Sequence, residues 1–186
     1  MDNGREFLIL CHSYGGIPGC AATDGFTVEE RKNSGKKGGF RAILFIAAFA
    51  MPRTGMDLLQ SLKGRYPSWM TPHEPFYQKN ITCCVNDKGK HCFYNDLPDD
   101  IAQQYFNSVV PFSQDAFETP IDFAASDLTI PRTFLICEND LAFPPSVQEE
   151  LATSILDMKI ERCSAGHSPF ASQPDRVIEI VKGLLD

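Results

Sequence analysis

Ser13 is the residue of this chain whose surroundings are best suited to chemistry. It lies in the segment Cys11-His12-Ser13-Tyr14-Gly15-Gly16, directly after a run of apolar residues. A serine between small residues on a tight strand-to-helix turn is the pattern of a nucleophile elbow, in which the hydroxyl is exposed at the end of the strand. Gly15 fits this pattern, whereas Cys11 stands where a glycine is usual. The segment predicts a nucleophile that attacks a carbonyl group, with the Tyr14 N–H as the first backbone donor to the developing negative charge. The alternative is an ordinary turn with a solvent-facing serine.

Such a nucleophile needs a histidine that takes its proton and an acid that orients the histidine. Of the four histidines in the chain, His167 follows the last apolar run, in Ser164-Ala165-Gly166-His167-Ser168, where Gly166 allows a loop over the sheet edge. Asp140 follows the preceding run, in Cys137-Glu138-Asn139-Asp140-Leu141. His12 neighbours Ser13, so we expect its side chain to point away from the serine and to pack beneath the turn. Asp57, after the second run, is a weaker candidate for the acid.

Four short apolar runs predict buried strands that would bring these residues together. They cover residues 7–11, 42–48, 133–137 and 159–163, and their spacing suggests a parallel sheet. Helices are predicted over 146–156, and over 172–185, where apolar residues recur at helical spacing and Ser172 is a natural N-cap. Strands that alternate with helices predict a doubly wound α/β architecture, in which active groups gather beyond the carboxyl ends of the strands.

A long insertion separates the second and third runs. Within it, residues 82–94 contain Asn86-Asp87-Lys88-Gly89 and predict a hairpin, while helices are predicted over 55–62 and 99–109. Such an insertion above the sheet edge would act as a cap over a pocket. The predicted division is a core of residues 1–51 and 128–186 and a cap of residues 52–127. We expect the cap aromatics to line the pocket, with the alternative that they form the cap's own core: Trp69, Phe76, Tyr77, Tyr105 and Phe106.

The composition limits the class of protein and its partners. With 186 residues and 43% apolar content, the chain can fill the core of one domain. A net charge of −7 argues against nucleic acid and anionic membrane as partners. The basic residues at 31, 32, 36 and 37 are the exception, and we expect them to form a solvated loop. The longest apolar stretch, 42–51, is too short to cross a bilayer, and the N-terminus does not have the pattern of a signal peptide.

Seven cysteines without a C-x-x-C pair favour a reducing compartment, so we expect a cytoplasmic protein with buried, inert thiols. The cysteines and histidines are not spaced like metal ligands, and we expect no metal and no other cofactor.

Three motifs resemble one family. H-S-Y-G-G, F-L-I-C-E-N-D-L-A-F-P and G-H-S-P-F, together with Phe93-Tyr94-Asn95-Asp96-Leu97-Pro98, resemble segments of α/β-hydrolases, especially the branch with plant methylesterases, hydroxynitrile lyases and related fungal esterases. The order serine, acid, histidine is also that of this superfamily. The resemblance implies an α/β fold with a mostly parallel sheet, flanking helices and an inserted cap. It further implies Ser13 as nucleophile, Asp140 as orienting acid and His167 as base.

In that family the elbow follows the fifth strand, so the resemblance implies a fold that is truncated at its N-terminal side. The loop that supplies the second oxyanion donor would be missing, and loss of one such donor costs about a hundred- to a thousandfold in rate. The strand over 7–11 would also become an unprotected apolar edge. We expect this strand to pair with another copy of the chain, or the elements to be rearranged to cover it. A third explanation is that the chain is a fragment of a longer hydrolase.

The leading functional prediction is a serine hydrolase that cleaves a small ester, thioester or lactone through an acyl-enzyme at Ser13. A lyase that uses the same triad for acid–base chemistry is an alternative enzyme. From a different class, the chain could be a non-catalytic ligand-binding or interaction module on the same fold.

Overall fold

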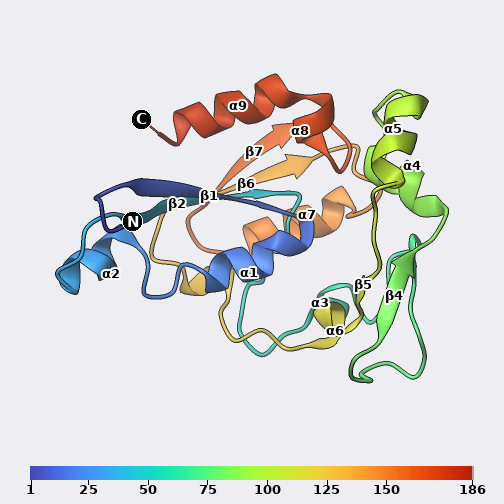
Figure 1. Ribbon diagram of the computed structural model, residues 1–186, viewed down its shortest axis with the longest axis horizontal. Coiled ribbons are helices and arrows are strands. Elements are labelled where there is room, and N and C mark those ends of the chain that lie inside the picture. The colour runs from blue at the N-terminus through green and yellow to red at the C-terminus, as the bar shows by residue number, and fades with distance from the viewer. Residues whose placement is uncertain (186) are drawn as a thin grey trace.

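A parallel sheet of four strands forms the centre of the molecule. The computed structural model in Figure 1 describes residues 1–185. The strand order is β1-β2-β6-β7, and all neighbouring strands are parallel. These strands are the four that the apolar runs predict, and their carboxyl ends meet at one edge of the sheet. Their bounds are β1 Glu6–His12, β2 Gly39–Ile46, β6 Arg132–Cys137 and β7 Met158–Cys163.

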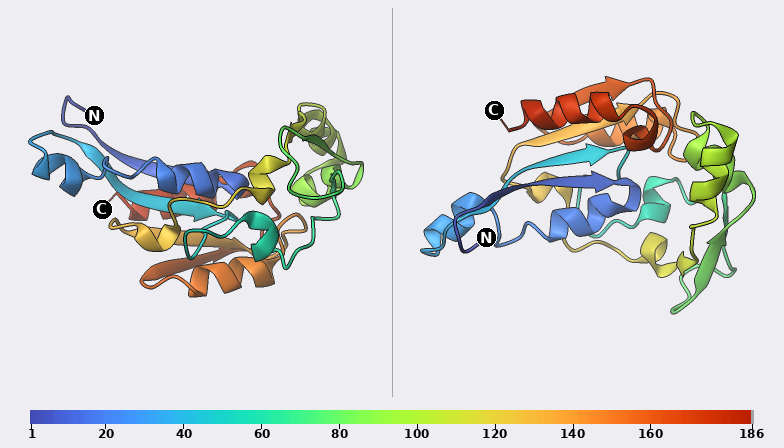
Figure 2. Two further views of the ribbon diagram at one scale, coloured as in Figure 1. Left: turned by 90° about the horizontal axis from the view of Figure 1, so that it is seen from below. Right: turned by 45° about the horizontal axis from the view of Figure 1, so that its top comes forward.

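Helices cover both faces of this sheet. Side chains of β2 alternate between the faces: Ile43 and Phe45 belong to a core that includes α1 and α7, whereas Leu44 and Ile46 pack with α9. Figures 1 and 2 show α9 on one side of the sheet and α1 and α7 on the other. This three-layer arrangement is the predicted doubly wound architecture. The bounds are α1 Gly16–Ala21, α7 Pro145–Thr153 and α9 Pro174–Gly183.

The connection from α1 to β2 contains a further helix, α2 Val28–Asn33, which starts at a capping box formed by Thr27 and Glu30. Arg31 of this helix is buried and donates hydrogen bonds to the carbonyl oxygens of Lys37 and Gly38. The expectation of a wholly solvated basic loop is therefore wrong for Arg31, because its guanidinium satisfies carbonyl groups of the chain that enters β2.

Residues 52–127, here called the cap segment, form a second, smaller sheet with short helices around it. The strand order is β3-β4-β5, and both pairings are antiparallel. In Figures 1 and 2 the segment stands beside the carboxyl edge of the main sheet. The helices expected over 55–62 and 99–109 are present in shorter form. The bounds are α3 Leu58–Ser61, β3 Met70–Thr71, β4 Thr82–Val85, α4 Lys88–Tyr94, α5 Asp99–Phe106, β5 Phe112–Ser113 and α6 Asp115–Glu118.

The hairpin predicted over residues 82–94 is wrong in its second half, where the chain forms α4. Asn86 accepts hydrogen bonds from the backbone N–H groups of Lys88 and Gly89, the first with its side chain and the second with its carbonyl oxygen. These bonds close a turn that continues as a helix. As a result Phe93 lies on a helix and not on a strand, and its ring lies near that of His167.

The start of α9 also differs from the prediction. Ser172 ends a short helix, α8 Pro169–Ser172, and Gln173 is the N-cap of α9. Proline has no backbone N–H to lose and has a helical φ, so Pro169 and Pro174 each set the beginning of a helix. No helix among residues 1–185 is long and apolar enough to cross a membrane. The core and cap boundaries at residues 52 and 127 stay a prediction, and Asp186 lies outside the described residues.

Candidate active site

Ser13 occupies a strained turn between β1 and α1. Its φ is 53°, in the left-handed region that non-glycine residues rarely adopt, while His12 before it is still extended. Ser13–Gly15 form one turn of 3-10 helix that leads directly into α1. The Ser13 carbonyl accepts a hydrogen bond of 2.9 Å from the Phe49 N–H, which ties the turn to the chain after β2. This is the backbone geometry of a nucleophile elbow.

The elbow accommodates Cys11 because Gly19 of α1 leaves space for its thiol, while Gly16 allows a second close approach. A Cβ on Gly19 of α1 would lie 2.1 Å from the Cys11 Sγ, so the thiol fills the space that a larger residue at position 19 would take. A Cβ on Gly16 would lie 2.6 Å from the Phe49 carbonyl oxygen, so α1 approaches the backbone after β2 closely. The usual glycine before the serine is thus replaced by a pair, Cys11 and Gly19, that packs tightly between β1 and α1.

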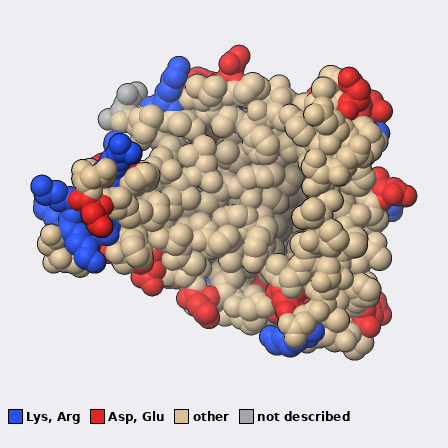
Figure 3. All heavy atoms as spheres, viewed as in Figure 1, with Lys and Arg blue, Asp and Glu red and all other residues tan. Residues whose placement is uncertain are grey.

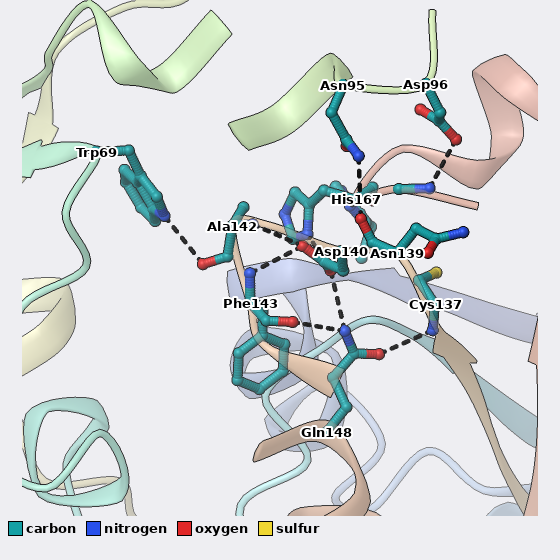
Figure 4. A network of polar contacts seen from close by, with 12 residues as sticks. Trp69, Asn95, Asp96, Cys137, Asn139, Asp140, Ala142, Phe143, Gln148 and His167 are labelled. Atoms are coloured by element: carbon teal, nitrogen blue, oxygen red, sulfur yellow. Dashed lines mark hydrogen bonds and ion pairs between the residues drawn. The ribbon is translucent and has the colours of Figure 1, made fainter. Parts of the chain in front are cut away.

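His167 and Asp140 form a buried pair at the ends of β7 and β6. His167 donates its Nδ1–H to the Asp140 Oδ2 over 2.7 Å, and the two side chains are 6% and 0% exposed. The Asp140 Oδ1 accepts the backbone N–H groups of Ala142 and Phe143, each over 2.8 Å. Because every one of these partners is a donor, the carboxylate is held as an acceptor, and the imidazole keeps its proton on Nδ1. The Nε2 atom of His167 is then the one available to act as a base (Figure 4).

His12 connects the elbow to the histidine loop. Its Nε2–H donates to the carbonyl oxygen of His167 over 2.8 Å, and the two rings lie with centroids 4.6 Å apart. β1 and β7 are the outermost strands of the sheet, so this contact spans β2 and β6. Burial, with a smaller contribution from His167, lowers the pKa of His12 to about 3. His12 is therefore neutral at ordinary pH and adds no positive charge beside His167. Its ring also lies against Phe170, with centroids 5.0 Å apart, so the side chain packs on the histidine loop, and its expected place beneath the turn stays a prediction.

Ser13 and His167 lie at the same sheet edge, but no hydrogen bond joins them in the described part of the chain. Ser13 and Phe93 line the same cavity, and the His167 ring lies against the Phe93 ring, with centroids 5.7 Å apart. Catalytic hydrogen bonds are often long before the substrate is bound. The missing hydrogen bond between Ser13 and His167 is therefore compatible with a serine–histidine pair.

Three side-chain contacts tie the cap segment to the loops that carry the acid and the base (Figure 4). Asn95 donates its side-chain amide to the Asn139 carbonyl over 3.0 Å, and Asp96 accepts the Gly166 N–H over 2.6 Å. Trp69 donates its indole N–H to the Ala142 carbonyl over 2.9 Å. Asn139 and Ala142 flank Asp140, and Gly166 precedes His167, so the cap segment helps to set the position of the loops that carry Asp140 and His167.

The cavity beside Ser13 has a volume of about 520 Å³ and an almost wholly apolar lining. None of its lining residues is charged, and its hydroxyl groups come from Ser13, Tyr14 and Ser113. The surface in Figure 3 is hollowed between the region over β1 and α1 and the region over α4 and β4. The cavity therefore suits an uncharged ligand. Its other lining residues are Phe49, Trp69, Val85, Phe93, Val109, Val110, Phe112, Ala116 and Phe117.

Of the five cap aromatics expected in the pocket, the structure brings only Trp69 into this cavity. Phe76 packs on Tyr66, and Tyr105 on Tyr94. Phe106 lies against α4 at Gly89. These three residues contribute to the packing of the cap segment, which is the alternative that the sequence leaves open.

The fifth aromatic, Tyr77, donates its hydroxyl to Asp57 on another part of the surface, over 3.2 Å. Asp57, the weaker candidate for the acid, is the N-cap of α3 and accepts the Gln60 N–H over 2.7 Å. His167 pairs with Asp140 instead.

The cysteines form no disulfide in the structure, and all but Cys84 are buried. Burial raises the pKa of the Cys11 and Cys20 thiols to about 12, so neither is reactive at ordinary pH. Within residues 1–185, no group of three or more histidine, cysteine or acidic side chains is placed to hold a metal ion.

A sheet with the order of these strands, a serine elbow after one strand and a histidine–acid pair after two others define the α/β-hydrolase class. Sequence comparison gives the same result, since residues 2–180 match the model of the alpha/beta hydrolase family. The chain belongs to this family. It is 30% identical to the alpha/beta hydrolase nvfD of Aspergillus novofumigatus over 185 residues, which cover 97% of this chain and 70% of the relative. It is 26% identical to the probable hydrolase R7 of a Phoma species, over 97% of this chain and 70% of that protein.

Solved structures with the same fold include polyneuridine aldehyde esterase, with a TM-score of 0.75 and 15% identity over 100% of this chain and 74% of that chain. Another is a pyrethroid hydrolase from Sphingobium faniae, with a TM-score of 0.68 and 16% identity over 96% of this chain and 70% of that chain. At these identities the likeness supports the fold alone.

Sequence reasoning missed several residues that surround the acid and the base. Gln148 bonds to Asp140 from α7, and Asn95 and Asp96 of the cap segment bond to the loops that carry Asp140 and His167. In the sequence, the F-Y-N-D-L-P segment carries a family resemblance but no assigned role. The signal that could have found Asn95 and Asp96 is that two adjacent polar residues follow two aromatic ones, at the end of a helix whose last residues are half-buried.

Proposed function

We propose that this protein is a serine hydrolase that cleaves uncharged carboxylic esters, with Ser13 as nucleophile, His167 as base and Asp140 as orienting acid. The observation that supports this most is the buried His167–Asp140 pair at the edge where Ser13 occupies a strained elbow. Strain of this kind is costly and persists where the surrounding structure holds it, as at catalytic positions. The family's esterase and hydrolase members make ester cleavage the natural reaction class.

The chemistry follows from the orientation of His167. Its Nε2 takes the proton of the Ser13 hydroxyl while the serine oxygen attacks the carbonyl carbon of the ester. The same proton then passes to the leaving alcohol, and the acyl group stays on Ser13. Water, deprotonated by His167, attacks the acyl carbon; the bond from that carbon to the Ser13 oxygen breaks, the acid leaves, and His167 returns the proton to the Ser13 oxygen. Asp140 stabilises the imidazolium that forms in each step.

The Tyr14 N–H is the donor we assign to the oxyanion, because it follows Ser13 at the start of the helical turn and Tyr14 lines the cavity. Loss of one oxyanion donor typically costs about a hundred- to a thousandfold in rate, so the number of N–H groups that face the oxyanion sets the rate of this reaction.

The cavity points to the substrate class. Its lining contains four phenylalanines and a tryptophan but no charged side chain, so it would bind an apolar acyl or alcohol group of a neutral ester, thioester or lactone. A lyase reaction is less well supported, because lyases of the branch that this sequence resembles often carry a lysine in the cap, and no lysine lines the cavity. We also propose that the protein acts in the cytoplasm, since its seven cysteines are free.

A fluorophosphonate probe tests this function directly, because it phosphonylates only an activated serine. We expect labelling of the purified protein at Ser13, no labelling of Ser13→Ala, and labelling reduced at least about a hundredfold in His167→Ala. Ser113→Ala serves as a control, because this second cavity serine should leave labelling unchanged. An unlabelled wild-type protein that still binds a neutral aromatic ester would support the non-catalytic ligand-binding module instead.

A further inference from the structure

Gln148 is a fully buried side chain of α7 that contacts Asp140. It is 0% exposed. Its Nε2 donates one hydrogen bond of 3.0 Å to the Asp140 Oδ2 and another of 2.6 Å to the Phe143 carbonyl, while its Oε1 accepts the Cys137 N–H over 3.0 Å. The same Asp140 oxygen accepts the Nδ1–H of His167. Gln148 and His167 therefore share one carboxylate oxygen (Figure 4).

The orientation of this amide has only one solution. The Cys137 N–H can only donate, so it must face the amide oxygen; the Phe143 carbonyl and the Asp140 carboxylate can only accept, so both must face the amide nitrogen. A glutamate would direct an acceptor at two acceptors. An apolar residue would remove the partner of the buried Cys137 N–H and Phe143 carbonyl and would leave the Asp140 Oδ2 with His167 alone. Gln148 thus joins the end of β6, the turn after it and the carboxylate into one rigid unit.

The hydrogen bonds of Gln148 prevent the Asp140 carboxylate from rotating. The Ala142 and Phe143 N–H groups hold the Asp140 Oδ1, but both come from the turn that carries Asp140 itself. Gln148 is the donor that holds Oδ2 from a different element, on the side of the carboxylate that meets His167. Without it, Oδ2 would be fixed by the histidine alone.

We propose that Gln148 is a positioning residue that holds the Asp140 carboxylate in the orientation in which it accepts the His167 Nδ1–H bond. This inference rests on the proposed function for its effect on rate, but not for its effect on the hydrogen bond. Gln148 does not touch the cavity; its action on substrate passes through Asp140 and His167.

Gln148→Met tests the proposal, because methionine keeps the length and bulk of glutamine and removes its hydrogen bonds. We expect kcat to fall about tenfold with KM unchanged, since one hydrogen bond to a charged group is lost and the cavity is intact. In an Asp140→Ala background the same substitution should lower kcat no further. The low-field NMR signal of the His167 Nδ1 proton should shift or exchange faster in Gln148→Met.

Gln114→Met is a matched control. Gln114 is also 0% exposed, makes three hydrogen bonds, and bonds to a buried carboxylate, that of Glu118, away from the catalytic pair. It should lower thermal stability by a similar amount without moving the His167 signal. If Gln148→Met does not fold, Gln148→Asn keeps an amide that is one methylene too short to reach Asp140, and the same changes are expected.

Three results would overturn the proposal: an unchanged His167 signal in a folded Gln148 variant, an equal loss of kcat in the Asp140→Ala background, or the same signal change in Gln114→Met. If the wild-type protein is neither labelled by fluorophosphonate nor active on esters, the proposed function fails, and the NMR comparison alone decides the role of Gln148.

Discussion

At the scale of single residues, the elbow shows how a strained turn tolerates a side chain that its pattern would exclude. Glycine is usual two positions before the serine because the strand and the following helix approach each other closely there. Here Cys11 carries a thiol into that space, and Gly19 of α1 makes room for it. Positions 11 and 19 share the space for one small side chain. The glycine that this contact needs therefore stands on the helix, at position 19, and not on the strand, at position 11.

Substitutions that change the size of the side chains at positions 11 and 19 test whether these two positions share space. Gly19→Ala would place a methyl group 2.1 Å from the Cys11 Sγ, so we expect a loss of about 1–3 kcal/mol in unfolding free energy from overpacking, partly offset by the better helix propensity of alanine. Cys11→Ala removes the sulfur, so the double variant Cys11→Ala, Gly19→Ala should be more stable than the sum of the single effects predicts. Urea unfolding of the four proteins measures this coupling. Simple additivity would show that the two positions do not share space.

The sequence is sufficient to place Ser13, Asp140 and His167 at one edge of the sheet, because each of them follows a strand that can be predicted from its apolar residues. Parallel strands bring their carboxyl ends to one edge, so the order along the chain is enough to place the three residues near one another. The partners of these residues cannot be found in the same way. The Asp96 carboxylate and the Gly166 N–H are 70 positions apart, and only the docking of the cap segment on the sheet brings them together.

At the scale of elements, the contact between the cap segment and the histidine loop depends on the absence of a side chain at Gly166. The sequence suggests that this glycine gives the loop its freedom to turn. The structure gives a different reason: a Cβ there would lie 2.3 Å from the Asn95 Oδ1 and 2.9 Å from the Asp96 Oδ1. Gly166 is required because Asn95 and Asp96 approach its backbone closely.

Gly166→Ala should therefore loosen the cap segment. We expect faster amide hydrogen exchange in α4 and α5, a loss of about 1–3 kcal/mol in unfolding free energy, and weaker fluorophosphonate labelling of Ser13, because Asn95 and Asp96 must move away from the catalytic loops. Gly183→Ala on α9 is the matched control, since a Cβ at that position would meet no other part of the chain within 4 Å. If exchange in α4 is the same in both variants, the cap segment does not depend on Gly166.

The errors in the predicted elements have local physical causes. Asn86-Asp87-Lys88-Gly89 has the composition of a hairpin turn, but the Asn86 side chain accepts the Lys88 N–H at the start of a helix instead. A single sequence cannot separate these outcomes, because the same residue types serve both turns and helix starts. The strands are easier to predict, since short apolar runs of four to eight residues that are bounded by turn residues favour buried strands over helices.

At the scale of the whole molecule, the two edges of the main sheet differ in character. β7 has the sequence Met-Lys-Ile-Glu-Arg-Cys, and its charged residues form ion pairs with each other and with the helices nearby. Charges of this kind protect a sheet edge from further pairing. β1 has five consecutive residues without a charge, from Phe7 to Cys11, and Leu10 is 49% exposed. Figure 3 shows that charged side chains on the face over β1 and α1 lie mainly at its rim.

The expected rearrangement that would cover β1 is not present among residues 1–185, where β1 pairs only with β2. The expectation of self-association through this strand therefore stays a proposal, with a second copy of the chain as the partner. Two β1 strands related by a two-fold axis would pair antiparallel and extend two sheets into one.

We predict that the protein dimerises in a concentration-dependent way and that Leu10→Lys prevents it, because a lysine there places a charge in the middle of the paired edge. Light scattering after size exclusion should give a wild-type mass that rises above the 20.7 kDa of one chain as concentration increases, and a constant monomer mass for the variant. Leu156→Lys is the control, since Leu156 is 79% exposed and lies outside β1; it should dimerise like the wild type. A wild-type protein that stays monomeric at all concentrations would contradict the proposal, because the apolar edge would then be stable in water on its own.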